Sequence, residues 1–541
     1  MQKFLNIFRV PRIGIHRLIL LLAAVFTLVF NHSFFSNVYA LYGSSLHGWG
    51  FITSLGLLLF ALNVLLLCVL CVRFTTKAVL TILLVGGASA SYYMDHFNIV
   101  VDSTMLTNVL QTNPREAGDL LTVALIGELL VLGLLPAWWL WHTTISYCRW
   151  TRELRNRLLL VVGSLVLALV SAVPFTADYA SFLREHKLLR YYTNPVTFVY
   201  SSVSLAHDKL AKHASGPRVA VGVNAHKIAS TTRRNLVILV VGETARADHF
   251  SLNGYDRATN PLLTKADVVF FSSITSCGTS TAFSVPCMFS ASGRKNFDLE
   301  QATHTENLLD VLQHAGVSVL WRDNNSDSKG VAQAVEFQDF RTSTLNSHCD
   351  EIECRDVGLL DGLDQWIAAH PSGDLTVVLH QMGNHGPAYY KRYPAEFAKF
   401  LPACTSNQLE TCTQQEIINS YDNALLYTDF FLSQVIDFLK TQDDNFATAM
   451  LYASDHGESL GEKGLYLHGA PFLLAPEAQT HVGALMWFGA HYLVDREQLK
   501  QRATVAGSHD DFFHTVLGML DIQTPEYDQG KDWLATARKH D

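Results

Sequence analysis

Charged side chains are scarce in this chain of 541 residues. Lys, Arg, Asp and Glu make up 16% of the sequence, whereas 49% of the residues are hydrophobic. This balance lies between soluble and membrane proteins, so we expect an integral membrane part in a chain that is also too long for one ordinary domain. No long run of Lys and Arg occurs, and the formal net charge is -9. Because nucleic-acid recognition needs clustered basic side chains, we exclude nucleic acid as a partner.

Cysteine is also sparse, and its positions divide the chain. Three of the nine cysteines lie in the apolar first third. The other six form closely spaced couples, namely Cys277 with Cys287, Cys349 with Cys354, and Cys404 with Cys412. None of these couples has the C-x-x-C spacing of thiolate metal sites, so we predict three local disulfides. Disulfides persist in oxidising compartments, which places this part of the chain in a periplasm or outside the cell.

Five apolar windows are long enough to cross a membrane as helices, which takes roughly 20 residues each. They lie at about 17–36, 49–72, 78–97, 120–141 and 158–177. Basic residues gather before the first window, between the second and third, and between the fourth and fifth, whereas the two other short loops contain only Arg115. The positive-inside rule therefore places the N-terminus in the cytoplasm and the chain after residue 177 outside. The V-Y-A sequence ending at Ala40 resembles a signal-peptide cleavage site, but the alternation of charge requires an uncleaved first helix.

We divide the chain into a five-span transmembrane domain (1–177), an interfacial linker (178–230) and a soluble domain (231–541). The linker interleaves basic and aromatic residues, which is typical of a segment at a membrane surface. From Asn235 onward, short apolar runs alternate with amphipathic stretches. This pattern predicts an α/β domain with a mostly parallel sheet covered by helices on both faces. In such sheets the active site lies at the carboxyl ends of the strands, so the polar residues after each run are candidates.

Acids and histidines follow several of these predicted strands. They are Glu243 in V-V-G-E-T, His385 in G-N-H-G-P, Asp455 and His456 in A-S-D-H-G, and His468 in Y-L-H-G. Each residue alone has an ordinary structural explanation, such as a helix-capping acid or a buried histidine. Together they form a metal-site pattern. Carboxylate and imidazole ligands without thiolate suit Zn²⁺, with Mn²⁺ as a substitute, and suit Mg²⁺ less well.

The stretch from Ser276 to Cys287, S-C-G-T-S-T-A-F-S-V-P-C, places Thr281 where a loop enters a predicted helix. A helix N-terminus offers free amide donors, and an ordinary cap is the alternative for an isolated threonine. Glu243, Asp455 and His456 make three ligands and leave a fourth tetrahedral position for the Thr281 oxygen. Metal coordination would lower the pKa of this hydroxyl, which has no obvious base beside it in the sequence. His385 and His468 would hold a second ion, or bind phosphoryl oxygens and protonate the leaving group.

The outside loop before the fourth window contains Asn108, Thr112 and Glu116, which share one face if the loop is helical. Such a face could hold a zwitterionic head group, and a solvated helix face is the alternative. Glu128 lies inside the fourth window, where a carboxylate is costly. It has a function there, or it is a neutral side chain that faces another helix.

The motifs G-E-T-A-R, S-C-G-T-S-T-A, N-H-G-P and S-D-H-G-E resemble, in this order, those of the alkaline phosphatase and sulfatase superfamily. With five spans ahead of such a domain, the whole chain resembles the lipid A phosphoethanolamine transferases and is similar to the transferable colistin-resistance enzymes. The resemblance implies an enzyme of the bacterial inner membrane with a periplasmic catalytic domain. Its donor would be phosphatidylethanolamine, its acceptor a lipid A phosphate, and Thr281 would carry a covalent phosphoethanolamine. The modification would lower the negative charge of the outer membrane and so give resistance to polymyxin and colistin.

The same resemblance implies roles for individual residues. One tightly bound zinc ion would be held by Glu243, Thr281, Asp455 and His456, and His385 and His468 would surround a second zinc ion or the substrate. The donor head group would be surrounded by Asn108, Thr112, Glu116, Ser326 and Lys329. A lysine at position 329 also makes sense by itself, because an ammonium can meet a phosphate as a point charge.

Several alternatives follow from the same residues. A phosphoglycerol transferase would share the threonine and the metal, but Glu116 can pair with an ammonium that glycerol lacks. Transfer of phosphoethanolamine to another envelope glycan is the second alternative. A sulfatase would need a C-x-P-S-R nucleophile, which is absent from the sequence. A binding protein on an inactive scaffold would have lost a ligand or the nucleophile, and none is missing. The sequence does not determine the oligomeric state, for which we expect a monomer.

Overall fold

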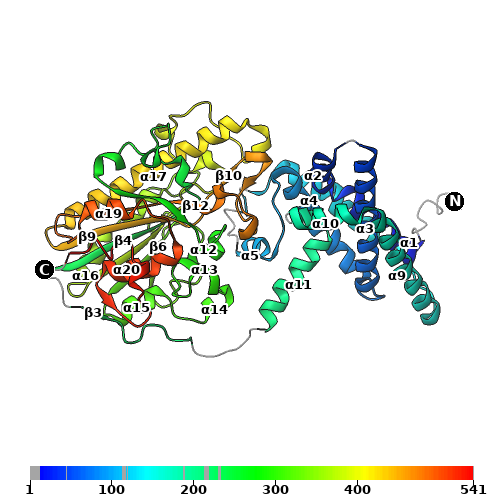
Figure 1. Cartoon of the computed structure of the whole chain (residues 1–541), viewed down its shortest axis with the longest axis horizontal. Helices are drawn as coiled ribbons and strands as arrows, with labels where there is room; N and C mark the ends of the chain where they lie inside the picture. The colour runs from blue at the N-terminus through cyan, green and yellow to red at the C-terminus, as the bar shows by residue number, and fades with distance from the viewer. Residues whose placement is uncertain are drawn as a thin grey trace, which may run out of the picture. The chain divides into compact units, whose positions relative to one another are not determined.

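The computed structural model describes residues 12–43, 45–111, 117–118, 120–186, 189–211, 218–228 and 233–539 (Figure 1). The chain forms two compact units. The first comprises Met1–Leu106 and Leu121–Asp208, and the second comprises Thr107–Leu120 and Lys209–Asp541. The predicted ends of the transmembrane domain, at residue 177, and of the linker, at residue 230, lie on either side of the junction between Asp208 and Lys209. Both boundaries stay predictions.

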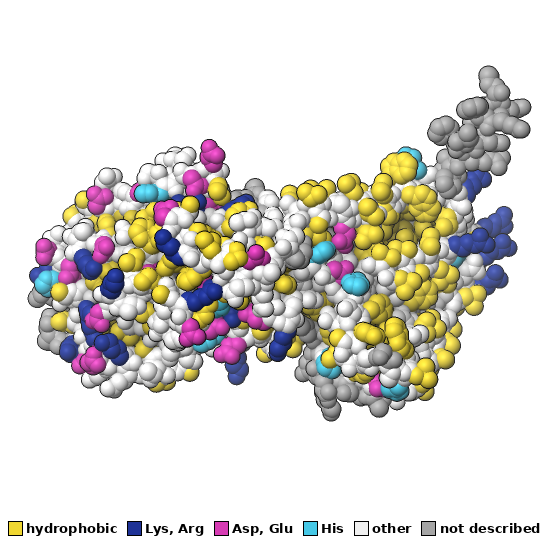
Figure 2. All heavy atoms as spheres, turned by 90° about the horizontal axis from the view of Figure 1, so that it is seen from above, with side chains coloured by type: hydrophobic (Ala, Val, Ile, Leu, Met, Phe, Trp, Pro, Cys, Tyr) yellow, Lys and Arg dark blue, Asp and Glu magenta, His cyan; other side chains and the backbone are white. Residues whose placement is uncertain are grey.

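The first unit is helical. Four stretches are long and apolar enough to cross a membrane, namely α3 (Leu46–Leu70), α4 (Thr76–Phe97), Val123–Trp141 and Trp150–Phe175. The third stretch consists of α7 (Val123–Glu128), a π-helical turn at Leu129–Leu134 and α8 (Leu135–Trp141), and the fourth of α9 (Trp150–Ala172) and a 3₁₀ turn at Val173–Phe175. These four confirm the second to fifth predicted windows. Figure 2 shows hydrophobic side chains over much of the visible face of this unit. The exposed side chains of α9 include Leu158, Leu159, Leu165 and Leu169.

The first predicted window differs from a single straight span. Helices α1 (Ile15–Val29) and α2 (His32–Tyr42) are bent by 55° at a short break, so they make a fifth span only if the pair counts as one. Polar groups explain the break. The side chain of Asn31 donates hydrogen bonds to the carbonyl oxygens of Phe26 and Asn194, and the N–H of Ser33 donates to the Asp95 carboxylate instead of continuing α1.

Shorter elements complete this part of the chain. They are β1 (Arg12–Gly14) paired with β2 (Thr144–Ser146), and the helices α5 (Ser103–Gln111), α10 (Thr176–Glu185) and α11 (Val196–Ala211). Glu128, the last residue of α7, has its Oε2 3.8 Å from Nε2 of His96 on α4. The carboxylate thus lies near an imidazole on a neighbouring helix.

The second unit is an α/β domain built on an eight-stranded sheet with the order β13-β5-β12-β9-β4-β8-β6-β7. The strands are β4 (Arg234–Gly242), β5 (Val269–Thr275), β6 (Ser318–Asp323), β7 (Glu336–Asp339), β8 (Leu375–His380), β9 (Phe446–Ser454), β12 (His481–Phe488) and β13 (Gly507–Ser508). Only β12 runs antiparallel to its neighbours in this sheet. The predicted, mostly parallel α/β sheet is confirmed.

Side chains of β4 alternate between the two faces of the sheet, as a strand requires. Val237, Leu239 and Val241 join the core that contains residues of α12 (Thr281–Met288), α15 (Leu308–His314) and α20 (Phe512–Met519). The residues between them join the opposite core, which contains residues of α16 (Leu363–Ala369) and α17 (Gln414–Gln442). Helices therefore cover both faces, which explains the continuous apolar run of this strand.

Smaller elements surround the sheet. They are α13 (Gly293–Asn296), α14 (Leu299–Thr303), α18 (Glu477–Thr480), α19 (Arg496–Arg502), and the strand pairs β3 (His226–Lys227) with β14 (Ile522–Gln523) and β10 (Ser459–Leu460) with β11 (Tyr466–Leu467). The six cysteines of this unit form disulfides in the predicted pairing, Cys277–Cys287, Cys349–Cys354 and Cys404–Cys412.

The register of the central strands decides where the site forms. Gly242 at the end of β4 pairs with Ser454 at the end of β9, and Val241 pairs with His380 at the end of β8. On the far side of β8, His380 pairs with Asp323, the last residue of β6. Four parallel strands thus end at the same level, so the residues that follow them meet at one edge of the sheet.

Candidate metal centre and nucleophile

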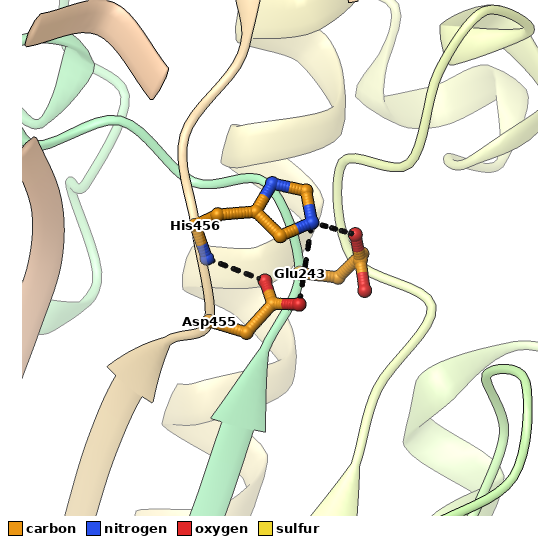
Figure 3. Close-up of side chains that lie close together, drawn as sticks. All are labelled: Glu243, Asp455 and His456. Atoms are coloured by element: carbon orange, nitrogen blue, oxygen red, sulfur yellow. Dashed lines mark hydrogen bonds and ion pairs between the residues drawn. The ribbon is translucent and has the colours of Figure 1, made fainter. Parts of the chain in front are cut away.

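Glu243, Asp455 and His456 converge at this edge (Figure 3). Glu243 directly follows β4, and the other two directly follow the neighbouring β9. All three side chains are fully buried, and Nε2 of His456 lies 3.4 Å from Oε1 of Glu243 and 3.4 Å from Oδ2 of Asp455. One ligand atom from each residue can be chosen so that all lie within 4.8 Å of one another. The structure thus brings together three of the predicted metal ligands.

The arrangement fits a divalent cation. Oδ2 of Asp455 is buried and accepts no hydrogen bond within the described part of the chain. Nδ1 of His456 lies 2.9 Å from the carbonyl oxygen of Gly457, which favours a proton on Nδ1 and leaves the lone pair of Nε2 facing the carboxylates. Two buried carboxylates are costly unless a cation compensates their charge. The donor set and its orientation therefore fit a divalent metal ion.

The electrostatics of these groups agree with this interpretation. Burial raises the pKa of Asp455 to about 6, although a nearby His380 and backbone hydrogen bonds act in the opposite direction. Burial also lowers the pKa of His456 well below its usual value, and the neighbouring imidazole of His468 adds to the shift. A metal ligand must be an ionised carboxylate or a neutral imidazole. His456 is therefore neutral near pH 7, as a metal ligand must be, and a bound cation would stabilise the ionised form of Asp455.

Thr281 lies beside these ligands. It is the first residue of α12, and its Oγ1 lies 3.1 Å from Oε2 of Glu243 and 3.3 Å from Nε2 of His456. The hydroxyl donates its hydrogen bond to the Glu243 carboxylate. Although no base is near Thr281 in the sequence, the fold brings a proton acceptor to it from β4.

The other hydroxyls of the same loop shape the approach to α12. Ser276 donates to the carbonyl oxygen of Gly278, and Thr279 donates to that of Ala470. The disulfide between Cys277 and Cys287 joins this loop to the helix that it enters. These contacts hold the loop, while Thr281 alone among these hydroxyls contacts Glu243 and His456 in the described structure.

His385 and His468 also reach this region. The ring centroids of His456 and His468 are 4.4 Å apart, and those of His385 and His468 are 5.8 Å apart. Nδ1 of His468 lies 3.3 Å from Oε2 of Glu458, a fully buried carboxylate that the sequence reasoning missed. The sequence could have indicated Glu458, because it is the last residue of the S-D-H-G-E motif.

Asn325 is a second residue that the sequence reasoning missed. Its Nδ2 donates to Oε2 of Glu243 at 2.8 Å and to the carbonyl oxygen of Gln381 at 2.9 Å. It therefore holds the carboxylate that also accepts from Thr281. The sequence could have indicated Asn325, because the run D-N-N-S lies at the carboxyl end of β6. Functional side chains of a parallel sheet collect at the carboxyl ends of its strands.

The predicted donor residues are described only in part. Ser326 and Lys329 belong to the loop after β6, where Nζ of Lys329 donates to the carbonyl oxygen of Ser326 at 2.8 Å. Asn108 lies on α5. Thr112 and Glu116 lie outside the described residues. The donor-binding role of these five residues stays a prediction.

His509 contacts the loop and the helix that position Thr281, the candidate nucleophile. Its Nδ1 accepts a hydrogen bond from the N–H of Cys277 at 3.1 Å and lies 3.4 Å from Oγ of Ser284 on α12. Ser284 in turn donates to the carbonyl oxygen of Asp455 at 2.5 Å. This buried imidazole thus connects the loop before Thr281, the helix of Thr281 and the segment of a metal ligand.

We expect His509→Ala to lower kcat by about 10- to 100-fold with little change in KM, because small displacements of a nucleophile are costly. His509→Asn should recover part of the loss, since its side-chain oxygen can accept from the Cys277 N–H. Steady-state turnover would be measured beside the unfolding midpoint. Wild-type kcat in a correctly folded Ala variant would contradict the positioning role.

The fold and the site together define a class of protein. A mostly parallel sheet with buried acids, a histidine and a helix-start threonine at its strand ends is the arrangement of a sulfatase-like enzyme. The Sulfatase family model matches residues 235–522, and the model of the phosphoethanolamine transferases EptA/EptB matches residues 59–210.

Similarity to individual proteins extends over nearly the whole chain. Phosphatidylethanolamine transferase Mcr-1 of Escherichia coli is 44% identical over 95% of this chain and 96% of its own length. Phosphoethanolamine transferase EptA of Salmonella typhimurium is 42% identical over 84% of each chain. The solved structure of the integral membrane protein lipooligosaccharide phosphoethanolamine transferase A from Neisseria meningitidis matches with a TM-score of 0.93 and 38% identity, covering 98% of this chain and 100% of that one. The chain belongs to the phosphoethanolamine transferase family, and the resemblance found in the sequence is confirmed.

Proposed function

We propose that this enzyme transfers phosphoethanolamine from phosphatidylethanolamine to a lipid A phosphate through a covalent intermediate on Thr281. The observation that carries the proposal is the position of the Thr281 hydroxyl, 3.1 Å from Glu243 and 3.3 Å from His456 in a buried acid and histidine cluster. The transferases named above support the choice of the transferred group. The transferred phosphoethanolamine carries an ammonium group, so its attachment to a lipid A phosphate lowers the negative charge of the outer membrane and thereby gives polymyxin and colistin resistance.

In the first half of the reaction, the Thr281 oxygen attacks the phosphorus of the donor. A bond between phosphorus and Thr281 forms, and the bond between phosphorus and the diacylglycerol oxygen breaks. The threonine proton leaves toward the Glu243 carboxylate, its hydrogen-bond acceptor. His385 or His468 gives a proton to the departing diacylglycerol oxygen.

In the second half, an oxygen of the lipid A phosphate attacks the phosphorus held on Thr281. The bond to Thr281 breaks, its oxygen takes back the proton that Glu243 received, and the histidine regains a proton from water, which restores the enzyme. The N-terminus of α12 faces the developing phosphoryl charge with free backbone N–H groups. These two half-reactions make the enzyme ping-pong, so donor cleavage can be measured without acceptor.

Glu243, Asp455, His456 and Thr281 would hold a zinc ion. His385 and His468, with Glu458 beside them, would hold a second zinc ion as the alternative to protonating the leaving group. When bound, zinc supplies a Lewis acid that lowers the pKa of a hydroxyl and offsets phosphoryl charge. Without such help a threonine hydroxyl is a weak nucleophile.

The basic loops and the three disulfides support an inner-membrane protein with a cytoplasmic N-terminus and a periplasmic catalytic domain. Both proposed lipids are then reached from the same side of the membrane. We propose that the enzyme works there as a monomer.

Mass spectrometry of lipid A tests the proposal. Cells that express this chain should contain lipid A with an added phosphoethanolamine, and cells with the empty vector should not.

The purified enzyme should release diacylglycerol from vesicles of phosphatidylethanolamine at least about tenfold faster than from vesicles of phosphatidylglycerol, because a charged partner such as Glu116 discriminates by about this factor. Faster release from phosphatidylglycerol would favour the phosphoglycerol transferase instead. Unmodified lipid A together with a modified envelope glycan would overturn the acceptor assignment.

A further inference from the structure

Arg294 lies between two aromatic rings near the helix of the nucleophile. Its guanidinium carbon is 4.9 Å from the ring centroid of Phe283 and 3.7 Å from that of Phe472. Phe283 is two residues after Thr281 on α12, and Phe472 begins a 3₁₀ turn, Phe472–Leu474, four residues after His468. Arg294 therefore connects two segments that contribute to the candidate active site.

Backbone contacts hold both sides of this arrangement in place. Gly293 has a φ of +63°, and Oδ1 of Asp510 accepts a hydrogen bond from the N–H of Arg294 at 2.6 Å. A side chain at position 293 would be strained by this φ, and its Cβ would lie 3.0 Å from Oδ2 of Asp510. On the other side, the N–H of Gly469 donates to the carbonyl oxygen of Thr279, which ties the segment before Phe472 to the nucleophile loop. The guanidinium is thus pre-organised.

The guanidinium of Arg294 has hydrogen-bond donors that no described residue engages. Within the described residues it makes no side-chain hydrogen bond or ion pair, and Asp510 acts on it only through its charge. Arginine offers five N–H donors in a plane that matches phosphate oxygens, and stacking on aromatic rings leaves those donors free. Leu473, the residue after Phe472, is 94% exposed. A cation next to an exposed apolar side chain suits an anionic group that is attached to hydrocarbon.

Helix geometry separates this arginine from the reacting phosphorus. Successive residues of an α-helix are rotated by about 100°, so residues two apart point in nearly opposite directions. Thr281 points toward Glu243 and His456, and Phe283 with Arg294 therefore lies on another face of α12. A phosphate held by Arg294 is not the one that Thr281 transfers.

We propose that Arg294 binds a second phosphate of the acceptor, remote from the phosphate that receives phosphoethanolamine. This inference rests on the proposed function. Lipid A suits the site because it is an acylated disaccharide with a phosphate at each end. One phosphate meets Thr281, while the other contacts Arg294 and the adjoining acyl chains contact Leu473. Arg294 is then a specificity-determining residue for doubly phosphorylated acceptors.

The test compares acceptors with the purified full-length enzyme in phosphatidylethanolamine vesicles. Transfer is measured to lipid A with both phosphates and to the two forms that lack one of them. We expect Arg294→Gln to lower kcat/KM on the doubly phosphorylated acceptor by about 10- to 100-fold, the value of hydrogen bonds to a charged group. On the singly phosphorylated acceptor that the wild type uses, the kcat/KM of Arg294→Gln should differ from that of the wild type by less than about twofold. Diacylglycerol release without acceptor should also stay unchanged.

Matched variants complete the design. Lys295→Gln removes an equal charge at the next, exposed position and should behave like the wild type. Phe472→Ala keeps the arginine but removes one stacking ring, and it should produce the same acceptor-specific loss. Unfolding midpoints show whether each variant is folded.

Three results would overturn the assignment of Arg294. They are an unchanged Arg294→Gln enzyme, an equal loss on singly and doubly phosphorylated acceptors, and slower diacylglycerol release, which would assign Arg294 to the donor phosphate. If the wild type transfers nothing to any lipid A, the proposed function itself fails and the acceptor role of Arg294 fails with it.

Discussion

Replacing Thr281 with Val is expected to abolish phosphoethanolamine transfer, with a loss of at least about a thousandfold in kcat/KM, since the nucleophilic oxygen is removed. Valine has nearly the shape of threonine, so the start of α12 and the packing around it should be retained. The hydroxyl contacts Glu243 and His456 directly, and no other hydroxyl of the loop from Ser276 makes these contacts in the described structure. Another side chain is therefore not positioned to replace it.

Two measurements distinguish a lost nucleophile from a damaged site. Peptide mass spectrometry of wild-type enzyme incubated with donor alone should find phosphoethanolamine on the peptide that contains Thr281, and the Val variant should have none. Thr281→Ser keeps a hydroxyl at this position and should retain part of the activity, while its zinc content should equal that of the wild type. A Val variant that still forms the adduct, or wild-type enzyme with the adduct on another residue, would disprove the assignment.

Replacing Asp455 with Asn is expected to remove most of the bound zinc and to lower turnover by at least about a thousandfold, because the ligand set loses a charged oxygen. Metal content would be measured by elemental analysis after dialysis against a fixed free zinc concentration. In the wild type, zinc should raise the unfolding midpoint, since a ligand that binds only the folded state stabilises it by about 2.7 kcal/mol at 100 times its dissociation constant. The Asn variant should lose this shift.

The pH dependence of zinc binding is a second test of Asp455 as a metal ligand. Burial raises the pKa of Asp455 from 3.8 to about 6 in the metal-free protein, so the folded state holds the proton more tightly than the unfolded state. The stabilisation from this proton is present at low pH and is lost as the pH rises toward 6. Zinc competes with the same proton, and its affinity should therefore increase up to about tenfold per pH unit until about pH 6.

Asp437→Asn serves as the matched control, because it makes the same substitution at an exposed position of α17. It should leave zinc content, turnover and the pH dependence unchanged. Full zinc occupancy and turnover in Asp455→Asn would show that this carboxylate is not a ligand.

Most of the candidate site follows from local sequence. Glu243, Asp455 and His456 stand immediately after apolar runs, and a parallel sheet brings such positions to one edge whatever the order of its strands. The predicted spans depend on apolar length, and the disulfides depend on short spacing, so both are properties of continuous segments. The bend between α1 and α2 was missed because the hydrogen bonds of Asn31 and Ser33 extend to residues elsewhere in the chain.

The sequence by itself determined the fold class, the order of the motifs, the cysteine pairs and the nucleophile candidate, because each depends on residues close together in the chain. Only the tertiary structure decided which of those groups touch. Asn325 reaches Glu243 from the loop after β6, His509 reaches Cys277 from 232 residues away, and Arg294 lies between rings from two other segments. These contacts depend on strand order and register, which combine short-range patterns from distant parts of the chain.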